Sequence, residues 1–217
     1  MSTVLTLAKK EFLLEWRQRS IIGGMLLYVV STVFICYLSM KQVVDLPTWN
    51  ALFWIIQTFI AVNSIARSFL QESKGRMLYY YTIVDAQSMI LSKMVYGLGL
   101  MVVLSAIHLG VYSLLIGNPV NDFKMFGIAV LLGSLGFAAV ITMVSAIAAK
   151  ASNNIGLVSI LGFPVLIPIL MTTIRFSKCA MDGLGWAVAQ KFALLLIGLN
   201  LLVVALAYLL FPYLWRE

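Results

Sequence analysis

The sequence predicts an all-α integral membrane protein with six transmembrane helices. Of its 217 residues, 62% belong to the hydrophobic set AVILMFWYC and only 11% are charged, whereas a soluble domain is roughly 45–50% apolar. A soluble protein of this size could not bury so much apolar surface. The composition therefore excludes a soluble enzyme, a nucleic-acid-binding domain and a disordered chain. We expect no nucleic-acid partner, and we read the formal net charge of +7 as a topology signal.

Residues 2–19 are expected to form an amphipathic helix. Leu5, Ala8, Phe12 and Trp16 recur at helical spacing, and Lys10, Arg17 and Gln18 lie away from this stripe. A helix of this kind, with an aromatic ring and Lys or Arg, is typical of a segment lying among lipid headgroups. The sequence thus predicts an interfacial helix before the first span, with a simple cytoplasmic extension as the alternative.

Six apolar stretches are long enough to cross the hydrocarbon layer, which takes about 20 helical residues. Runs this long and uniformly apolar favour helices over barrel strands, because backbone groups in lipid must be paired. The expected spans are residues 21–40, 48–66, 94–117, 125–149, 155–174 and 192–212. The first is not followed by a signal-peptide cleavage site, so we expect it to be retained. We expect a single transmembrane permease domain over residues 1–217.

The positions of Lys and Arg predict that both termini are cytoplasmic. With six spans, ten of the fifteen Lys and Arg fall on the side of the N-terminus and five on the other. Such a bias marks the cytoplasmic side. Three of the five outer charges gather in the last outer loop, as Arg175, Lys178 and Lys191.

The connection over residues 67–93 is far longer than the roughly 4–6 residues usual between elements, and it lies on the expected cytoplasmic side. It combines a charged, Gly-containing turn with a cluster of Met, Leu and Tyr, a composition favoured at protein interfaces. We expect it to dock a partner. A solvated loop with tyrosines at the membrane interface is the alternative. The candidate docking residues are Phe69, Glu72, Gly75, Leu78, Tyr79 and Tyr80.

Three residues within the spans are candidates for a substrate path or a hinge. His108 is the only histidine and lies in the third span; it is either a substrate contact or a neutral side chain hydrogen-bonded to a neighbouring helix. Pro164 and Pro168 in the fifth span each remove a backbone donor, so we expect that helix to be kinked or broken. The alternative role of these prolines is packing alone.

The sequence lacks the motifs of a membrane enzyme or pump. It contains no Gly-x4-Gly-Lys-Ser/Thr phosphate loop, no carboxylate pair within the expected spans and no Cys/His cluster with metal-ligand spacing. Its two cysteines, Cys36 and Cys179, are expected to be free thiols. We therefore expect no enzyme activity in this chain by itself, no catalytic residue and no metal site.

Four stretches resemble the haem exporter protein B (CcmB) family, a group of ABC-2-type permeases. They are the N-terminal Lys9-Lys-Glu-Phe-Leu-Leu-Glu-Trp-Arg17, then Phe69-x-x-Glu72, then Gly156-Leu-Val-Ser-Ile-Leu-Gly-Phe-Pro-Val-Leu-Ile-Pro168, and finally Ala180-Met-Asp182. The resemblance is spread over nearly the whole chain, and the Pro-x3-Pro stretch is its most specific part. In the loop the sequence departs from the family, with Tyr79 and Tyr80 at positions where the family has Glu-Gln.

This resemblance implies a permease subunit for haem export or delivery in c-type cytochrome biogenesis, in the bacterial inner membrane. It implies that ATP acts only through a separate ABC ATPase subunit, which would contact loop 67–93, and that the complex uses this ATP either to move haem as its substrate or to release the loaded haem chaperone. The other implied partners are further cytochrome c maturation membrane proteins, a periplasmic haem chaperone and a second copy of the chain. Arg175, Lys178 and Lys191 would then face haem propionates or an acidic chaperone surface, unless they form a solvated rim. An ABC-2 permease for a drug, lipid or polysaccharide, or a nontransporting assembly factor, remains the alternative.

Overall fold

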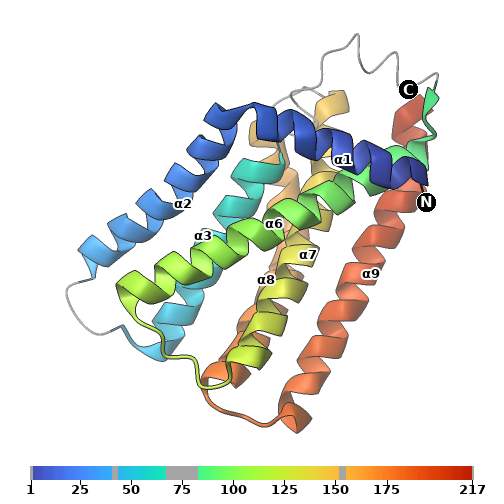
Figure 1. Ribbon diagram of the computed structural model, residues 1–217. Helices are drawn as coiled ribbons and strands as arrows, with labels where there is room; N and C mark the ends of the chain where they lie inside the picture. Colours follow the sequence, from blue (N-terminus) through green and yellow to red (C-terminus); the bar gives the residue numbers. More distant parts are fainter. Residues whose placement is uncertain (1, 41–43, 67–82, 152–154, 217) are drawn as a thin grey trace.

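The computed structural model describes residues 2–40, 44–66, 83–151 and 155–216, and this part of the chain forms seven α-helices (Figure 1). The expectation of an all-α protein is therefore confirmed for the described residues. The helices are α1 (Ser2–Arg17), α2 (Arg19–Ser39), α3 (Leu46–Ile65), α6 (Ala86–Ile116), α7 (Phe123–Ala151), α8 (Ile155–Met181) and α9 (Trp186–Arg216).

Five of the described helices, α2, α6, α7, α8 and α9, are long and apolar enough to cross a membrane. The chain is thus a multi-pass membrane protein. Helix α3, which covers the second expected span, is not among the five. The reason is its content of polar side chains, which include Asn50, Gln57 and Asn63 and lower its mean hydropathy.

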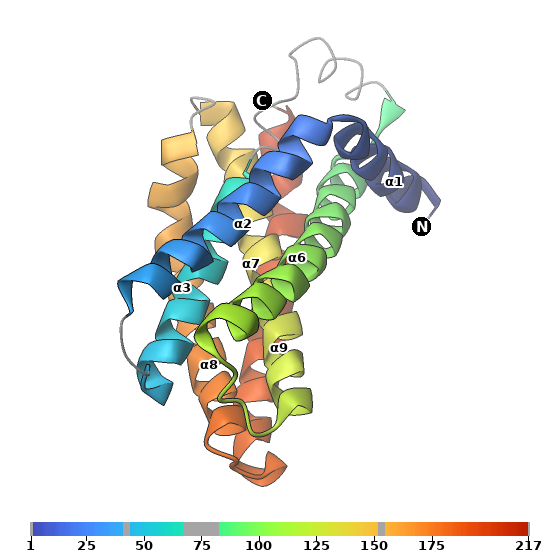
Figure 2. The same ribbon diagram turned by 60° about the vertical axis from the view of Figure 1, so that its left-hand side comes forward.

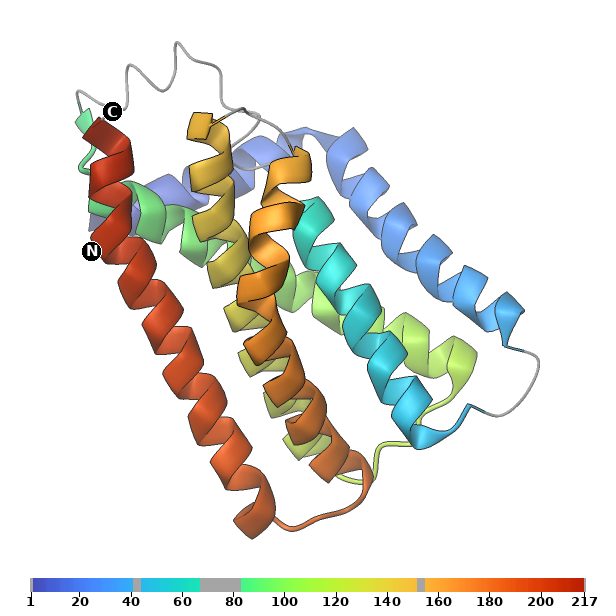
Figure 3. The ribbon, with the colours of Figure 1, turned by 180° about the vertical axis from the view of Figure 1, so that it is seen from behind.

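Helix α7 forms the centre of the bundle and packs against α3, α6, α8 and α9. Helix α6 crosses the bundle obliquely and contacts α1 and α2 (Figures 1 and 2). On the opposite face α9, α8 and α3 run side by side (Figure 3). The start of α1 and the end of α9 lie at the same end of the bundle in all three views.

The close packing around α7 depends on glycines at helix crossings. A Cβ added to Gly133 would lie 2.8 Å from side-chain atoms of both Trp54 on α3 and Thr173 on α8. Small residues of this kind let membrane helices approach closely. The rigid Trp54 ring is fully buried at this crossing, so α3, α7 and α8 meet where Gly133 leaves room.

The helix boundaries follow from local capping residues. Asp45 precedes α3, its carboxylate accepts a hydrogen bond from the backbone N–H of Thr48, and Pro47 lies in the first turn. Asp85 caps α6 in the same way. Gly117 has a φ of +93° directly after α6, a conformation that favours glycine.

Two expectations about the ends of the spans need correction. Helix α6 begins at Ala86, so residues 86–93 of the expected loop are helical, because Asp85 caps the helix there. Helix α8 extends to Met181 and α9 begins at Trp186. Arg175 and Lys178 therefore lie on α8, and Lys191 lies on α9, rather than in a long outer loop.

The prolines do not break α8, which is one continuous helix through Pro164 and Pro168. Both prolines are exposed on the surface of the bundle. The hydroxyl of Thr172 donates to the carbonyl of Pro168 at 2.7 Å. Because α8 continues through both prolines, the expected break is wrong, whereas the expected kink stays a prediction.

Candidate functional site

A buried polar cluster joins α3, α6 and α7 inside the bundle. Nδ1 of His108 on α6 lies 2.8 Å from Oε1 of Gln57 on α3. The side-chain amide of Gln57 donates to the hydroxyl of Ser105, which lies 2.7 Å from the hydroxyl of Ser134 on α7. All four side chains are buried. Buried polar groups are costly unless paired, so these contacts hold three helices in one register.

The environment of His108 agrees with a neutral side chain bonded to a neighbouring helix. Its ring stacks on Phe53, with the ring centroids 4.6 Å apart, and it is fully buried. Because the Gln57 amide donates to Ser105, its carbonyl oxygen accepts from His108, which places the imidazole proton on Nδ1. Nε2 then carries a lone pair, and no partner for it lies among the described residues. In this conformation His108 lines no open path.

A second polar group links α3 to α8 and was not expected from the sequence. The side-chain amide of Asn50 donates to the carbonyl of Ile174 at 3.0 Å, and its carbonyl oxygen accepts from Ser177 at 2.7 Å. The indole of Trp54 donates to the same Ser177 hydroxyl at 2.8 Å. Asn50, Trp54 and Gln57 follow each other at intervals of four and three residues, which is the spacing of one helix face. This spacing is the sequence pattern from which a polar face of α3 could have been predicted.

The charges Arg175, Lys178 and Lys191 lie at the end of the bundle away from the chain termini, at the α8–α9 connection (Figure 1). All three side chains are exposed. Nζ of Lys191 lies 5.2 Å from the centroid of the Phe192 ring. Arg175 and Lys178 are three residues apart and share a face of α8, whereas Lys191 lies on α9, and their role at the outer face stays a prediction.

At the opposite end, α1 lies across the beginning of α6 (Figures 1 and 2). Nζ of Lys93 on α6 lies 3.5 Å from Oε1 of Glu11 on α1, and the Lys93 side chain is fully buried. Glu11 also lies 2.9 Å from Nζ of Lys10. A buried lysine needs compensating charge, so this pair fixes how α1 sits on α6. From the sequence, Lys93 was expected at the end of the loop 67–93, and no sequence pattern indicated its pairing with Glu11.

The residues expected to dock a partner, Phe69 to Tyr80, lie outside the described part of the chain. The helix that follows them begins at an exposed cap: the carboxylate of Asp85 accepts from the backbone N–H of Ser88 at 2.9 Å. Hydrogen bonds from Ser88 lower the pKa of Asp85 below its ordinary value of 3.8. This cap defines where α6 starts.

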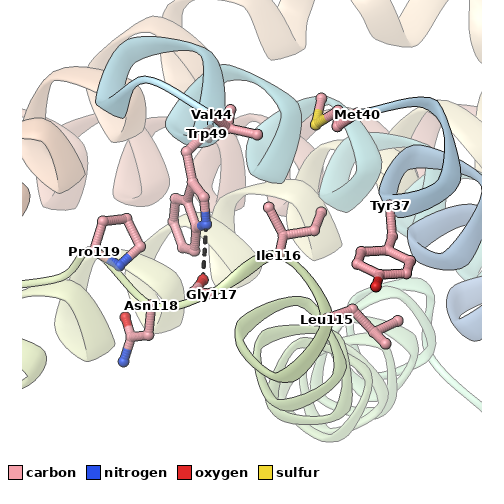
Figure 4. A pocket seen from close by; sticks show the side chains of 9 residues that line it. All are labelled: Tyr37, Met40, Val44, Trp49, Leu115, Ile116, Gly117, Asn118 and Pro119. Atoms are coloured by element: carbon pink, nitrogen blue, oxygen red, sulfur yellow. Dashed lines mark hydrogen bonds between the residues drawn. The ribbon is translucent and has the colours of Figure 1, made fainter. Parts of the chain in front are cut away.

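A cavity of about 330 Å³ lies between the ends of α2, α3 and α6 (Figure 4). Tyr37 comes from α2, Met40 follows its last residue, and Trp49 comes from α3. The Trp49 indole points at the carbonyl of Gly117, to which it donates at 3.0 Å. This bond ties α3 to the end of α6. We assign no ligand to the cavity, whose wall is mostly apolar.

The described residues contain no group of three or more His, Cys, Asp or Glu that could hold a metal ion. Cys36 and Cys179 form no disulfide with each other, and Cys179 is buried. Nε2 of His108 has no hydrogen-bond partner among the described residues, and the imidazole ring contacts the rings of Phe53 and Tyr112.

Comparison with known proteins identifies one family. The family model described as CcmB protein matches residues 2–213, from the start of α1 into the last turns of α9. Nothing among the curated proteins matches the chain. The family match therefore covers the first six described helices and all but the end of α9.

Proposed function

Since the chain belongs to the CcmB protein family, we propose that it is the permease subunit of an ABC transporter complex that exports or delivers haem for c-type cytochrome biogenesis. The observation that carries this proposal is the family match over nearly the whole chain. It agrees with the five described helices that are long and apolar enough to cross a membrane. Because the sequence has no phosphate loop, the energy comes from ATP hydrolysed by a separate ATPase subunit. Haem is the substrate in this proposal.

In this proposal α3 is the sixth span. Its 20 residues suffice to cross the hydrocarbon layer, and its polar residues Asn50 and Gln57 are hydrogen-bonded inside the bundle instead of facing lipid. Six crossings agree with the start of α1 and the end of α9 lying at one end. The excess of Lys and Arg at this end favours cytoplasmic termini in a bacterial inner membrane.

Helix α1 is the interfacial helix of the proposed permease. The apolar stripe expected from the sequence divides in the structure: Ala8 is buried, whereas Leu5, Phe12 and Trp16 are exposed, Trp16 to 66%. Exposed Leu and aromatic side chains beside basic residues suit the boundary between headgroups and acyl chains. This arrangement supports the position of α1 at the cytoplasmic surface of the membrane.

The segment between α3 and α6 receives the ATPase, through Phe69, Glu72, Gly75, Leu78, Tyr79 and Tyr80. Co-purification of the chain with the ATPase, before and after Glu72→Ala and Tyr79→Ala, tests this contact. We expect both substitutions to weaken the complex and lower its ATPase activity, and Lys124→Ala at the far end to leave both unchanged. Unaltered complex formation in the loop variants contradicts the docking role.

Within the membrane, the helices shift between two packings when ATP is hydrolysed. Pro164 and Pro168 are the candidate hinge, since each lacks a backbone donor on the exposed side of α8. A separation of α3 from α6 would expose Nε2 of His108 to substrate. The charges Arg175, Lys178 and Lys191 would contact haem propionates or a periplasmic haem chaperone, and a second copy of the chain and further maturation proteins complete the complex.

A deletion strain tests the function. We expect loss of covalent haem staining of c-type cytochromes, with recovery when the wild-type chain is supplied. A partner ATPase that binds but cannot hydrolyse ATP should also fail to restore staining. Normal staining after deletion contradicts the proposal, and normal staining with the inactive ATPase favours a nontransporting assembly factor.

A further inference from the structure

The outer face of α1 carries a shallow basic groove. A hollow of about 290 Å³ is formed by side chains of this one helix. Its lining residues are Thr6, Lys9, Lys10, Leu13, Leu14 and Arg17. They recur every three or four residues, so cations and leucines alternate along a single stripe.

Contacts with α6 hold this groove away from the bundle. Ala8 is buried, and Glu11 reaches Lys93 on α6 at 3.5 Å. With 100° of rotation per residue, Ala8 and Glu11 lie on the side of α1 opposite Leu13. The ion pair with a fully buried lysine therefore fixes the rotation of α1, and the groove is directed outward.

The charges around the groove are of one sign. Lys9, Lys10 and Arg17 line it and no carboxylate does. Glu11 holds Lys10 at 2.9 Å, whereas no ion pair with a described residue engages Lys9 or Arg17, and both are exposed. Glu15 is half-buried and lies on the side of α1 that holds Ala8. Two long cations thus flank exposed Leu13 and Leu14.

A single-signed polar rim around an apolar floor fits a molecule with an anionic head and a hydrocarbon chain. We propose that the groove of α1 binds an anionic phospholipid, with its phosphate between Lys9 and Arg17 and an acyl chain along Leu13, which lies between Lys9 and Arg17 on the helix surface. The inference rests on the proposed interfacial position of α1. It goes further by giving α1 a preference for anionic lipids, because Lys9 and Arg17 attract an anionic headgroup more strongly than one without net charge.

Lipid selectivity is measured on the full chain in its complex, purified with an equimolar mixture of phosphatidylglycerol and phosphatidylcholine. Native mass spectrometry gives the ratio of the two lipids retained. We expect the wild type to favour phosphatidylglycerol. Each cation near an anionic lipid contributes roughly a fivefold preference, so Lys9→Gln with Arg17→Gln should lower the ratio at least about fivefold.

Two matched variants separate the site from general charge and folding effects. Lys9→Arg with Arg17→Lys keeps both charges and should retain the preference, and Lys124→Gln removes a cation from the far end of the bundle and should leave it unchanged. The inference is overturned if the wild type shows no preference, if the double Gln variant keeps it, or if Lys124→Gln lowers it equally. Loss of a copurifying acidic protein with an unchanged lipid ratio assigns the groove to a protein partner instead.

The interfacial position of α1 is read separately from the fluorescence of Trp16. The quencher is phosphatidylcholine brominated on its acyl chains, a lipid whose headgroup has no net charge. The quenching of the wild type minus that of Trp16→Phe reports whether Trp16 inserts among the acyl chains. Quenching without a phosphatidylglycerol preference overturns only the lipid site. Absence of quenching overturns the interfacial helix and with it the lipid site.

Discussion

Oε1 of Gln57 lies 2.8 Å from Nδ1 of His108, and this contact joins the interior of α3 to α6. Gln57 uses its amide group as well, since it donates to Ser105. One side chain on a helix of modest hydropathy therefore serves two polar groups of a neighbouring helix. The polar residues that set α3 apart from the other membrane-length helices are the ones that bind it into the bundle.

Gln57→Leu is expected to destabilise the protein by about 1–2 kcal/mol, because the buried Nδ1–H of His108 loses its acceptor. Asn63→Leu on the same helix is the matched control: the Asn63 amide donates to the carbonyl of Phe59 in its own helix and links no second helix. Thermal unfolding of the purified chain measures both. Equal stability of Gln57→Leu and wild type contradicts the role given to the contact.

Gly133→Ala is expected to cost about 1–3 kcal/mol, since its Cβ would press on the buried Trp54 ring and on Thr173 at 2.8 Å. Gly127→Ala on the same helix has nothing within 4 Å of its added Cβ and should be neutral or slightly stabilising. The test compares the melting temperatures of the two variants, and we expect that of Gly133→Ala to be the lower. A Gly133→Ala protein as stable as Gly127→Ala would show that the crossing is looser than described.

Glu11→Gln is expected to cost more stability than Lys93→Met. The first removes a carboxylate from a fully buried ammonium group, at a cost of up to about 3 kcal/mol. The second leaves Glu11 partly exposed and still 2.9 Å from Lys10. Thermal unfolding gives the order, and protease cleavage after α1 reports whether the helix stays docked. The reverse order would contradict the account of this pair.

Asp85→Ala is expected to cost about 1 kcal/mol through loss of the α6 cap. The pKa of Asp85 is lowered by its hydrogen bonds with Ser88, so the cap contributes above the ordinary carboxyl pKa and is lost as the pH falls through the lower folded value. The difference between wild type and variant should thus shrink below about pH 4. A difference that is constant from pH 7 to pH 3 rules out the charged cap.

Much of the fold was predictable because membrane helices are governed by length and hydrophobicity. The second expected span, 48–66, differs little from α3, and Asp45 and Pro47 mark its start in the sequence. The start of α6 was missed even though Asp85 is followed by Ser88. An apolar-run criterion ignores caps that lie outside the hydrocarbon layer, and the expected loop was therefore too long.

The buried site was less predictable than the fold. His108 was singled out correctly as a polar residue within a span, but its partner Gln57 is 51 residues away, and no local pattern joins them. The same holds for Glu11 and Lys93, which only the crossing of α1 over α6 brings together. Helix α8 is continuous through two exposed prolines, which the Pro-x3-Pro spacing does not encode.

Haem transfer by the reconstituted complex tests the central claim most directly. The permease with its ATPase is placed in vesicles that enclose a soluble haem-binding apoprotein, with haem and ATP supplied on the ATPase side. The account predicts that the Soret absorbance of the enclosed protein rises only when ATP is hydrolysed, and that a non-hydrolysable analogue gives no rise. ATP hydrolysis without haem reaching the enclosed protein would contradict it.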